Sequence, residues 1–290
     1  MQGIKEFNKK IISLKNTKKI TKTMKMVAAS KFRRVYKTQA SARLYAGTLT
    51  EMMSRIAASV EGAAHPLLKA RLPVRRILIV VMTSDRGLCG GFNNNLIRFI
   101  REWLKVNQKT VATAALSFCG KKGFQALHKS GKVEKFYEQI TQRPQFSDAQ
   151  KVAQDLNAAF LAGGYDEVYL AYNLFKSAMS QTPVLEKLLP IDPQVLTKVP
   201  ASKTISDYIF EPAQEELLNR LVPRYVQYRI YDALLENAAG EHGARMTAMD
   251  NAFRNCSDLM DRYLLLRNRA RQASITRELI EIISGAEALK

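Results

Sequence analysis

Cysteine is scarce in this sequence and follows no recognised spacing. The three cysteines, Cys89, Cys119 and Cys256, are odd in number and far apart. They form neither a CxxC pair nor the Cys/His spacing of a zinc site. This pattern argues against a disulfide framework and a structural zinc centre, and it favours a reduced, cytosolic environment.

Long hydrophobic runs are also missing. The longest, Ile77–Met82, is far shorter than the roughly 20 apolar residues that cross a bilayer. No apolar segment typical of a secretory signal is present. The N-terminus is poor in acidic residues, as transit peptides are, but it is rich in Lys rather than Arg and its pattern continues unbroken. We therefore expect mature protein without a transmembrane segment.

Residues that could carry catalysis are few. His65, His128 and His242 are scattered, with no carboxylate or nucleophile arranged around them. The loop at residues 84–92 follows a strand-like run, but its glycines are spaced GxxGG, which matches neither GxGxxG nor a phosphate-binding loop. A tight turn with positive φ is favoured over a nucleotide site. We predict no catalytic, cofactor-binding or metal-binding residue.

Proline and glycine are nearly absent from both ends of the chain. Residues 4–61 contain no proline and one glycine, and residues 224–284 contain no proline and two glycines, Gly240 and Gly243. Helices in soluble domains average about 11 residues, so these segments predict two very long helices. We expect the two glycines to let the second helix bend, and a short separate helix to precede Pro223.

Apolar residues in both segments recur at steps of three and four, the spacing of a coiled coil. In the first segment this pattern breaks at residues 15–19 and resumes at Met24. The positions are Ile4, Phe7, Ile11, Leu14, Met24, Ala28, Phe32 and Val35, and near the other end Leu259, Tyr263, Leu266, Ala270 and Ala273. These residues form an apolar row along one side of each helix, which a lone helix would expose to water. We therefore predict that the two ends pair as a long antiparallel two-helix coiled coil.

The middle of the chain alternates strand-like and helix-like segments. Strands are predicted at residues 76–83, 111–118, 133–137, 166–172 and 182–189, and helices at 93–106, 121–129 and 147–162. This alternation predicts an α/β domain with a Rossmann-like, mostly parallel sheet. The expected domains are an N-terminal helix (1–61), an α/β globular domain (75–200) and a C-terminal helix (212–286) paired with the first.

Positive charge is concentrated at one end. The chain has a net charge of +19, and residues 1–37 carry ten Lys and two Arg against only Glu6. Self-repulsion on this scale is tolerated most easily when an acidic partner lies opposite. Nucleic acid, anionic lipid and an acidic protein surface would each serve.

Four motifs resemble the γ subunit of the F-type rotary ATP synthase of bacterial type. They are KITKTMKMVAASK (19–31), SDRGLCGGFN (84–93), ARMTAMD (244–250) and NRARQASITREL (268–279). The resemblance covers essentially the whole chain. It implies the central rotor shaft of a proton-translocating synthase, a non-catalytic subunit without a cofactor that couples ion flow through the membrane c ring to ATP synthesis or hydrolysis on the β subunits. It also implies a peripheral location on the cytoplasmic face of the inner membrane.

The resemblance further implies contacts with four partners: the α and β subunits, ε and the c ring. Met24, Lys25, Arg245, Arg271, Gln272 and Thr276 are expected at the interface with the ring of α and β subunits. Lys18, Lys22, Lys31 and Cys89 are expected beside acidic loops of β, with Cys89 as a free thiol on an exposed turn. Tyr208 and Glu211 are expected at the c ring and ε.

Two other functions fit parts of the sequence. A coiled-coil nucleic-acid-binding protein would use phosphate contacts from the basic helix, but that helix lacks interleaved aromatics and the α/β domain stays unexplained. A nucleotide-dependent enzyme would need a phosphate-binding motif that the α/β domain lacks. The four motifs favour the rotor subunit.

Overall fold

The computed structural model describes residues 2–59, 65–108, 111–192 and 214–287. They belong to two compact units, described here one at a time. The helical unit consists of Met1–Ala28 and Arg245–Lys290, and the sheet unit consists of Ala29–Ala244. The two terminal helices, α1 (Gln2–Ser59) and α6 (Gln214–Glu287), contribute to both units.

Two very long helices are present, as predicted. Helix α1 has 58 residues and α6 has 74. The expected separate helix before Pro223 is wrong, because α6 continues through this proline. An interior proline costs about 3 kcal/mol, but Val222 and Val226 on either side of it are buried in the core of the sheet unit. Their burial helps to offset the cost of the missing hydrogen bond.

The sheet unit is built on five strands in the order β3-β2-β1-β4-β5. The strands are β1 (Arg76–Met82), β2 (Thr113–Cys119), β3 (Lys132–Tyr137), β4 (Glu167–Phe175) and β5 (Gln181–Leu189). Neighbouring strands are parallel except for the antiparallel pair β4–β5. The prediction of a mostly parallel sheet is confirmed.

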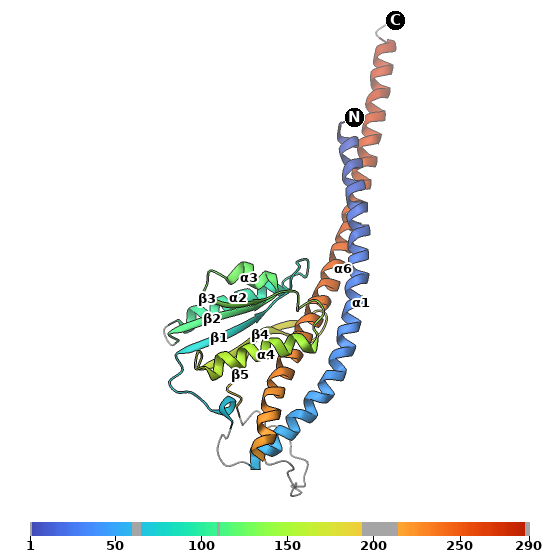
Figure 1. The fold of residues 1–290 in the computed structure, drawn as a ribbon. Helices are drawn as coiled ribbons and strands as arrows, with labels where there is room; N and C mark the ends of the chain where they lie inside the picture. Colours follow the sequence, from blue (N-terminus) through green and yellow to red (C-terminus); the bar gives the residue numbers. More distant parts are fainter. Residues whose placement is uncertain (1, 60–64, 109–110, 193–213, 288–290) are drawn as a thin grey trace. The chain divides into compact units, whose positions relative to one another are not determined.

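Helices cover both faces of this sheet (Figure 1). They are α2 (Phe92–Asn107), α3 (Lys121–Leu127) and α4 (Phe146–Leu161), together with a 3₁₀ turn at Pro66–Leu68. Strand β1 is buried on both sides, as its unbroken apolar run predicts. Ile77 and Ile79 face the core under α2 and α3, whereas Leu78 and Val80 face the core under α4 and α6.

Helix α1 packs against α6 within the sheet unit. Val35 forms a small buried cluster with Leu235, Ala238 and Ala239, and Phe32 packs against it. Small side chains on α6 let the two helices approach closely. Farther along, the rings of Tyr45 on α1 and Tyr228 on α6 stack with their centroids 4.3 Å apart. The predicted helix pair therefore extends into this unit.

The seam of the helical unit continues where the sequence predicted a break. Thr21 is buried, and Lys18 Nζ lies 5.0 Å from the centroid of the Phe253 ring. Lys25 Nζ donates to Asp250 Oδ1 at 2.5 Å. Polar residues thus occupy seam positions between Leu14 and Ala28, and the heptad runs through them. Apolar periodicity alone could not detect this interval.

The register predicted for the end of α6 is partly wrong. Leu259 and Leu266, assigned to the seam, are 41% and 43% exposed, whereas Cys256 is 8% exposed. Tyr263 does lie at the seam, with its ring centroid 6.1 Å from that of Phe7. Steps of three and four around Tyr263 fit more than one register, and the apolar Leu259 and Leu266 suggested the wrong one.

A buried carboxylate fixes the start of the sheet. Asp166 Oδ2 accepts hydrogen bonds from the backbone N–H groups of Arg75 and Arg76 at 2.9 and 2.8 Å, and its Oδ1 accepts one from Arg76 Nη2 at 3.2 Å. Burial alone would raise the pKa of Asp166, but these donors together hold it below its ordinary value. Asp166 therefore ties β4 to β1 as an anion.

We expect Asp166→Asn to lower the free energy of unfolding of the sheet unit by about 2–3 kcal/mol at neutral pH, because charged hydrogen bonds are lost. A depressed folded-state pKa means that the contribution is complete above the unfolded pKa of about 4 and is lost as pH falls through the folded pKa. Urea unfolding followed by the single tryptophan, Trp103, at pH 7 and at about pH 3 measures both effects. An equal deficit at both pH values would contradict the prediction.

Candidate functional site

The place where an α/β sheet ordinarily binds a ligand is filled by α6. Such ligands bind outside the carboxyl ends of the strands, where the strand order reverses, which in this sheet is between β1 and β4. There Asn237 Nδ2 of α6 donates to the carbonyl oxygen of Thr83 at 3.4 Å, and Glu236 Oε2 accepts from the N–H of Phe175 at 3.4 Å. Both α6 side chains are buried. The crevice holds a helix.

Two glycines allow this close approach. A Cβ at Gly240 would lie 2.9 Å from Phe92 Cε2, and one at Gly243 would lie 3.1 Å from Ala178 Cα. The sequence suggested that these glycines let the helix bend. The geometry gives them a different role, because larger residues would push α6 away from the loops at the sheet edge.

An aspartate of the chain itself occupies the position of a possible anion. Asp85, in the loop after β1, accepts hydrogen bonds from the N–H of Lys121 at 3.1 Å and from Thr141 Oγ1 at 3.2 Å. These are groups from the loops after β2 and β3, the kind that would bind a phosphate in a nucleotide enzyme. Their engagement by Asp85 argues against the nucleotide-dependent enzyme.

The Gly-rich loop is a tight turn with positive φ, as predicted. Gly90 has φ of 58°, and Leu88, which has a side chain, has φ of 63°. Inside the turn, Asn93 Oδ1 accepts the N–H of Ser84 at 3.0 Å, and Asn93 Nδ2 donates to Cys89 Sγ at 3.3 Å. Helix α2 begins at Phe92, so Asn93 lies inside the helix and is not its N-cap. From there its side chain stabilises the preceding turn.

Cys89 is not the exposed thiol that was expected. Its side chain is only 2% exposed, beneath the turn, whereas Leu88 is 64% exposed. The network around Asn93 draws the sulfur inward. Arg86 and Leu88 therefore present this loop to solvent, and all three cysteines are buried and free of disulfides.

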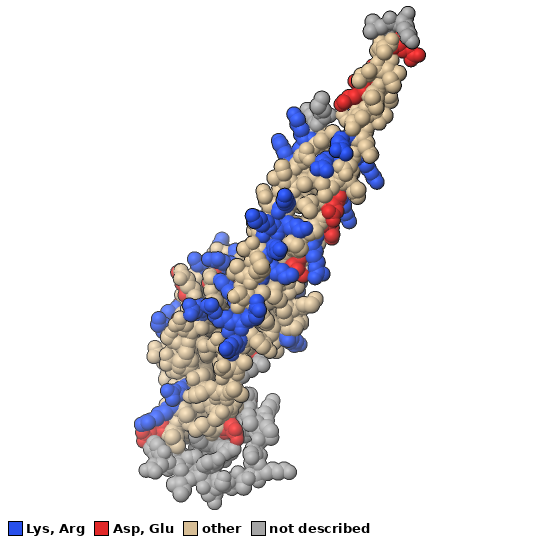
Figure 2. All heavy atoms as spheres, turned by 90° about the vertical axis from the view of Figure 1, so that its right-hand side faces the viewer, with Lys and Arg blue, Asp and Glu red and all other residues tan. Residues whose placement is uncertain are grey.

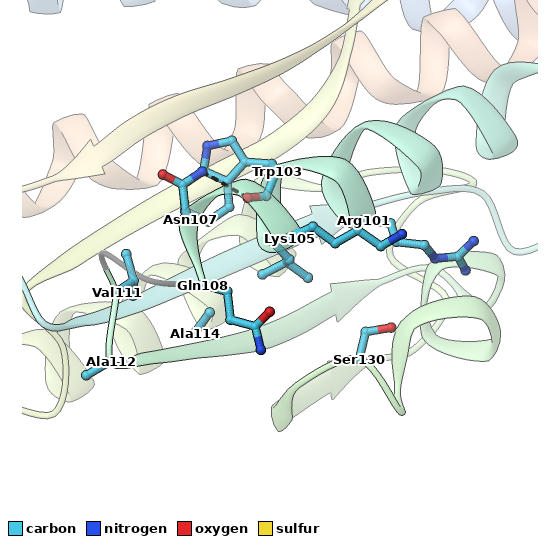
Figure 3. Close-up of a pocket in the computed structure, with 10 residues that line it drawn as sticks. Arg101, Trp103, Lys105, Asn107, Gln108, Val111, Ala112, Ala114 and Ser130 are labelled. Carbon is cyan, nitrogen blue, oxygen red and sulfur yellow. Dashed lines mark hydrogen bonds between the residues drawn. The ribbon is translucent and has the colours of Figure 1, made fainter.

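A second hollow lies at the opposite edge of the sheet, between the end of α2 and the start of β2 (Figure 3). Its volume is about 420 Å³, and its lining includes Trp103, Leu104 and Ala114 together with Arg101 and Lys105. None of the lining residues is Asp, Glu, His or Cys. The lining includes Lys105 and Ser130 but no carboxylate, imidazole or thiol that could activate them.

Metal-binding and membrane-spanning features were also sought in the described ranges. They contain no group of three or more His, Cys, Asp or Glu side chains placed to hold a metal ion. Within the same ranges, no helix combines the length and the apolarity required to cross a bilayer.

The six residues expected at the ring interface all fall in the helical unit. Arg271, Gln272 and Thr276 are exposed on α6, and Thr276 Oγ1 bonds back to the carbonyl of Gln272 at 3.0 Å. Met24, Lys25 and Arg245 are half-buried.

Asp250 is a residue of this site that the sequence did not reveal. It accepts from Lys25 Nζ at 2.5 Å and from Arg254 Nη2 at 2.9 Å. The hydrogen bond from Lys25 is the main cause that lowers the pKa of Asp250, assisted by Arg254. Lys25 is therefore ion-paired within the chain. The excess of positive charge on the first helix could have pointed to Asp250, because such an excess favours a negative charge on the helix that pairs with it.

The basic residues expected beside acidic loops are divided between the units. Lys18 and Lys22 belong to the helical unit, and Lys31 and Cys89 to the sheet unit. Lys22 and Lys31 are exposed. Figure 2 shows a face on which Lys and Arg side chains are many and Asp and Glu are few. Tyr208 and Glu211 lie outside the described residues.

The last turns of α6 expose large apolar side chains around the helix. Exposed fractions range from 49% for Ile275 to 67% for Ile282. The set is Ile275, Leu279, Ile280, Ile282 and Ile283. Exposed apolar side chains gathered in this way mark a contact with another protein or a membrane.

Comparisons with known proteins agree with this picture. A family model described as ATP synthase matches residues 3–289. The ATP synthase gamma chains of Geobacter metallireducens and Trichlorobacter lovleyi are 43% and 42% identical to this chain over the full length of both proteins. The chain therefore belongs to the ATP synthase gamma chain family.

Solved structures show the same fold. The central stalk and c-ring structure of the Tetrahymena thermophila mitochondrial ATP synthase contains a chain 28% identical to this one, with a TM-score of 0.58. That match covers 80% of this chain and 99% of the other. The rotor of the Euglena gracilis enzyme matches at 22% identity and a TM-score of 0.67, covering 94% and 98%. The nucleic-acid alternative receives no support from these relatives.

Proposed function

We propose that this chain is the central rotor shaft of a proton-translocating ATP synthase. The exposed apolar end of α6 carries the proposal. Five Ile and Leu side chains are each about half or more exposed, and covering the exposed part of each would contribute roughly half of the 1.5–3 kcal/mol that full burial gives, about 1–2 kcal/mol. A ring of α and β subunits that encloses this end would supply that cover.

The basic residues of α1 support the same assignment. Lys22 and Lys31 are exposed, and acidic loops of the β subunits would be partners of opposite charge. Contacts of this kind act mainly through steering and register, because exposed ion pairs contribute only about 0–1 kcal/mol each. Met24, Arg245, Arg271, Gln272 and Thr276 would meet the ring beside them.

The sheet unit is proposed to face the c ring and the ε subunit. Tyr208 and Glu211, which follow the Pro-rich stretch, would contact them on the cytoplasmic side of the inner membrane. Ion flow would turn the c ring together with this chain. The asymmetric shaft would then drive the three β sites in turn through open, loose and tight states, so the chemistry of ATP belongs to β and this chain is non-catalytic.

A rotation experiment tests the proposal. The exposed Met179 is changed to cysteine, which gives one accessible thiol because the native cysteines are buried. The variant is produced with the α and β subunits, which are immobilised, and a bead is attached to the thiol. We expect one chain to co-purify with three α and three β subunits, and the bead to turn in one direction when ATP is added.

Two results would refute the proposal. One is the absence of a stable complex with α and β subunits under conditions in which those subunits form a ring. The other is a stable complex whose bead shows only Brownian motion while ATP is hydrolysed.

A further inference from the structure

Helix α6 is fastened to the edge of the sheet by polar contacts as well as by apolar packing. The apolar contacts are those of Val226, Ile230 and Leu234 in the core of the sheet unit. Just beyond Leu234, Glu236 and Asn237 are buried and bonded to backbone groups at the end of β4 and directly after β1. A buried polar group is costly unless it is paired, so the bonds of Glu236 Oε2 and Asn237 Nδ2 favour one placement of the helix, although Asn237 Oδ1 has no hydrogen-bond partner among the described residues.

The contacts resist turning of α6 about its own axis. Successive residues of an α-helix are 100° apart, since there are 3.6 per turn. A rotation by one residue would replace Asn237 with an alanine, Ala238, and would leave the Thr83 carbonyl without its donor. Apolar burial restricts rotation less sharply, because the hydrophobic effect is non-directional and depends on the area removed from water.

Close packing beside the polar contacts adds a steric stop. A Cβ at Gly240 or Gly243 would lie closer to Phe92 or Ala178 than ordinary van der Waals contact, so a side chain there would force these neighbours to shift. The backbone of Phe92 is itself held by Asn173, whose Nδ2 donates to its carbonyl at 3.0 Å. A turn of α6 would bring a side-chain-bearing residue against the ring of Phe92 and the backbone of Ala178.

We propose that Asn237 is a positioning residue for torque transfer, the bond through which rotation of the sheet unit is imposed on α6. Glu236 assists it by holding the N–H of Phe175. The helix continues without interruption past Ala244 to Glu287, so a turn imposed at Asn237 is carried along its length. This inference rests on the proposed rotor function.

The test compares Asn237→Leu with Asn157→Leu in the assembled synthase in membrane vesicles. Asn157 is an amide on α4, with its Oδ1 buried and away from this contact, and it serves as the matched control. ATP hydrolysis and ATP-driven proton pumping are measured on the same preparation. We expect Asn237→Leu to keep hydrolysis within twofold of the native rate and to lower protons pumped per ATP at least threefold. Asn157→Leu should leave this ratio unchanged.

A merely structural role would lower the yield of assembled enzyme without changing the pumping ratio of the enzyme that assembles. An unchanged ratio in Asn237→Leu therefore overturns the inference. If that variant does not assemble, Asn237→Ser, which is smaller and keeps a donor, is measured in the same way, with an intermediate ratio expected and a native ratio counting against the inference. Failure of the native chain to assemble or pump would instead refute the rotor function itself.

Discussion

Replacing Gly120 with alanine is expected to lower the free energy of unfolding of the sheet unit by about 3–5 kcal/mol, from backbone strain and overpacking together. Gly120 links β2 to α3 with φ of 103°, a conformation that residues with a Cβ rarely adopt. A Cβ at this position would lie 2.2 Å from the carbonyl oxygen of Thr83. That oxygen belongs to the backbone at the end of the central strand, so it has little freedom to move.

Gly47→Ala provides the matched control for Gly120→Ala. Gly47 lies within α1, and a Cβ there would meet nothing within 4 Å. Alanine in a helix interior is favoured over glycine by about 1 kcal/mol, so this variant should be as stable as the native chain or slightly more so. Urea unfolding followed by Trp103 fluorescence measures both. Equal unfolding midpoints for the two variants would show that the turn at Gly120 can relax.

The same Thr83 carbonyl oxygen also accepts a hydrogen bond from the side-chain amide of Asn237. A displacement of the strand end in Gly120→Ala would therefore reach α6 as well as α3. We expect this variant to lose more than its local strain accounts for, because neighbouring interactions that share a partner are not additive.

Long-range regularity made much of the fold predictable from the sequence. The two terminal helices follow from segments almost without Pro or Gly, and the strands from apolar runs such as Ile77–Met82. Both patterns extend over many residues, so a single exceptional residue did not change the predicted element. The buried β1 and the antiparallel fifth strand lie where these runs placed them.

Features set by single tertiary contacts could not be predicted in this way. The residue type of Cys89 does not show that the thiol turns inward, because its burial depends on how the side chain of Asn93, four residues farther on, is oriented within the turn. The polar seam around Thr21 interrupts the apolar period, so a pattern search sees a gap where the structure has a continuous contact. Asp85 is an unremarkable loop acid until the loops after β2 and β3 bring Lys121 and Thr141 to it.

The candidate site shows the same division. Motifs identified the residues that the family resemblance implies, but not how they are used within the chain. Lys25 was expected to face another subunit, and the structure pairs it with Asp250. Sequence distance hides this contact, because the two residues come together only when α1 and α6 pair.

Phe160→Ala is expected to cost about 3–5 kcal/mol in stability of the sheet unit, the range for removing a fully buried aromatic side chain. Phe160, near the end of α4, is 0% exposed and packs in the core that α4 shares with α6. Its ring also lies under the Arg71 guanidinium, whose Cζ is 4.2 Å from the ring centroid. That contact adds about 0.5–1 kcal/mol of cation–π attraction.

Leu161, the next residue in the chain, provides a control that has nearly the same position in the helix but is not buried. Leu161 is 50% exposed on the same last turn of α4, so Leu161→Ala should change stability by no more than about 0.5 kcal/mol. Urea unfolding monitored by Trp103 compares the two variants. Phe160 belongs to the same buried core as Val226 and Ile230, so the cavity opens in the core against which α6 packs before Asn237. A loss in Phe160→Ala no larger than in Leu161→Ala would mean that α4 and α6 close over the cavity, and that the core does not hold α6 in one fixed position.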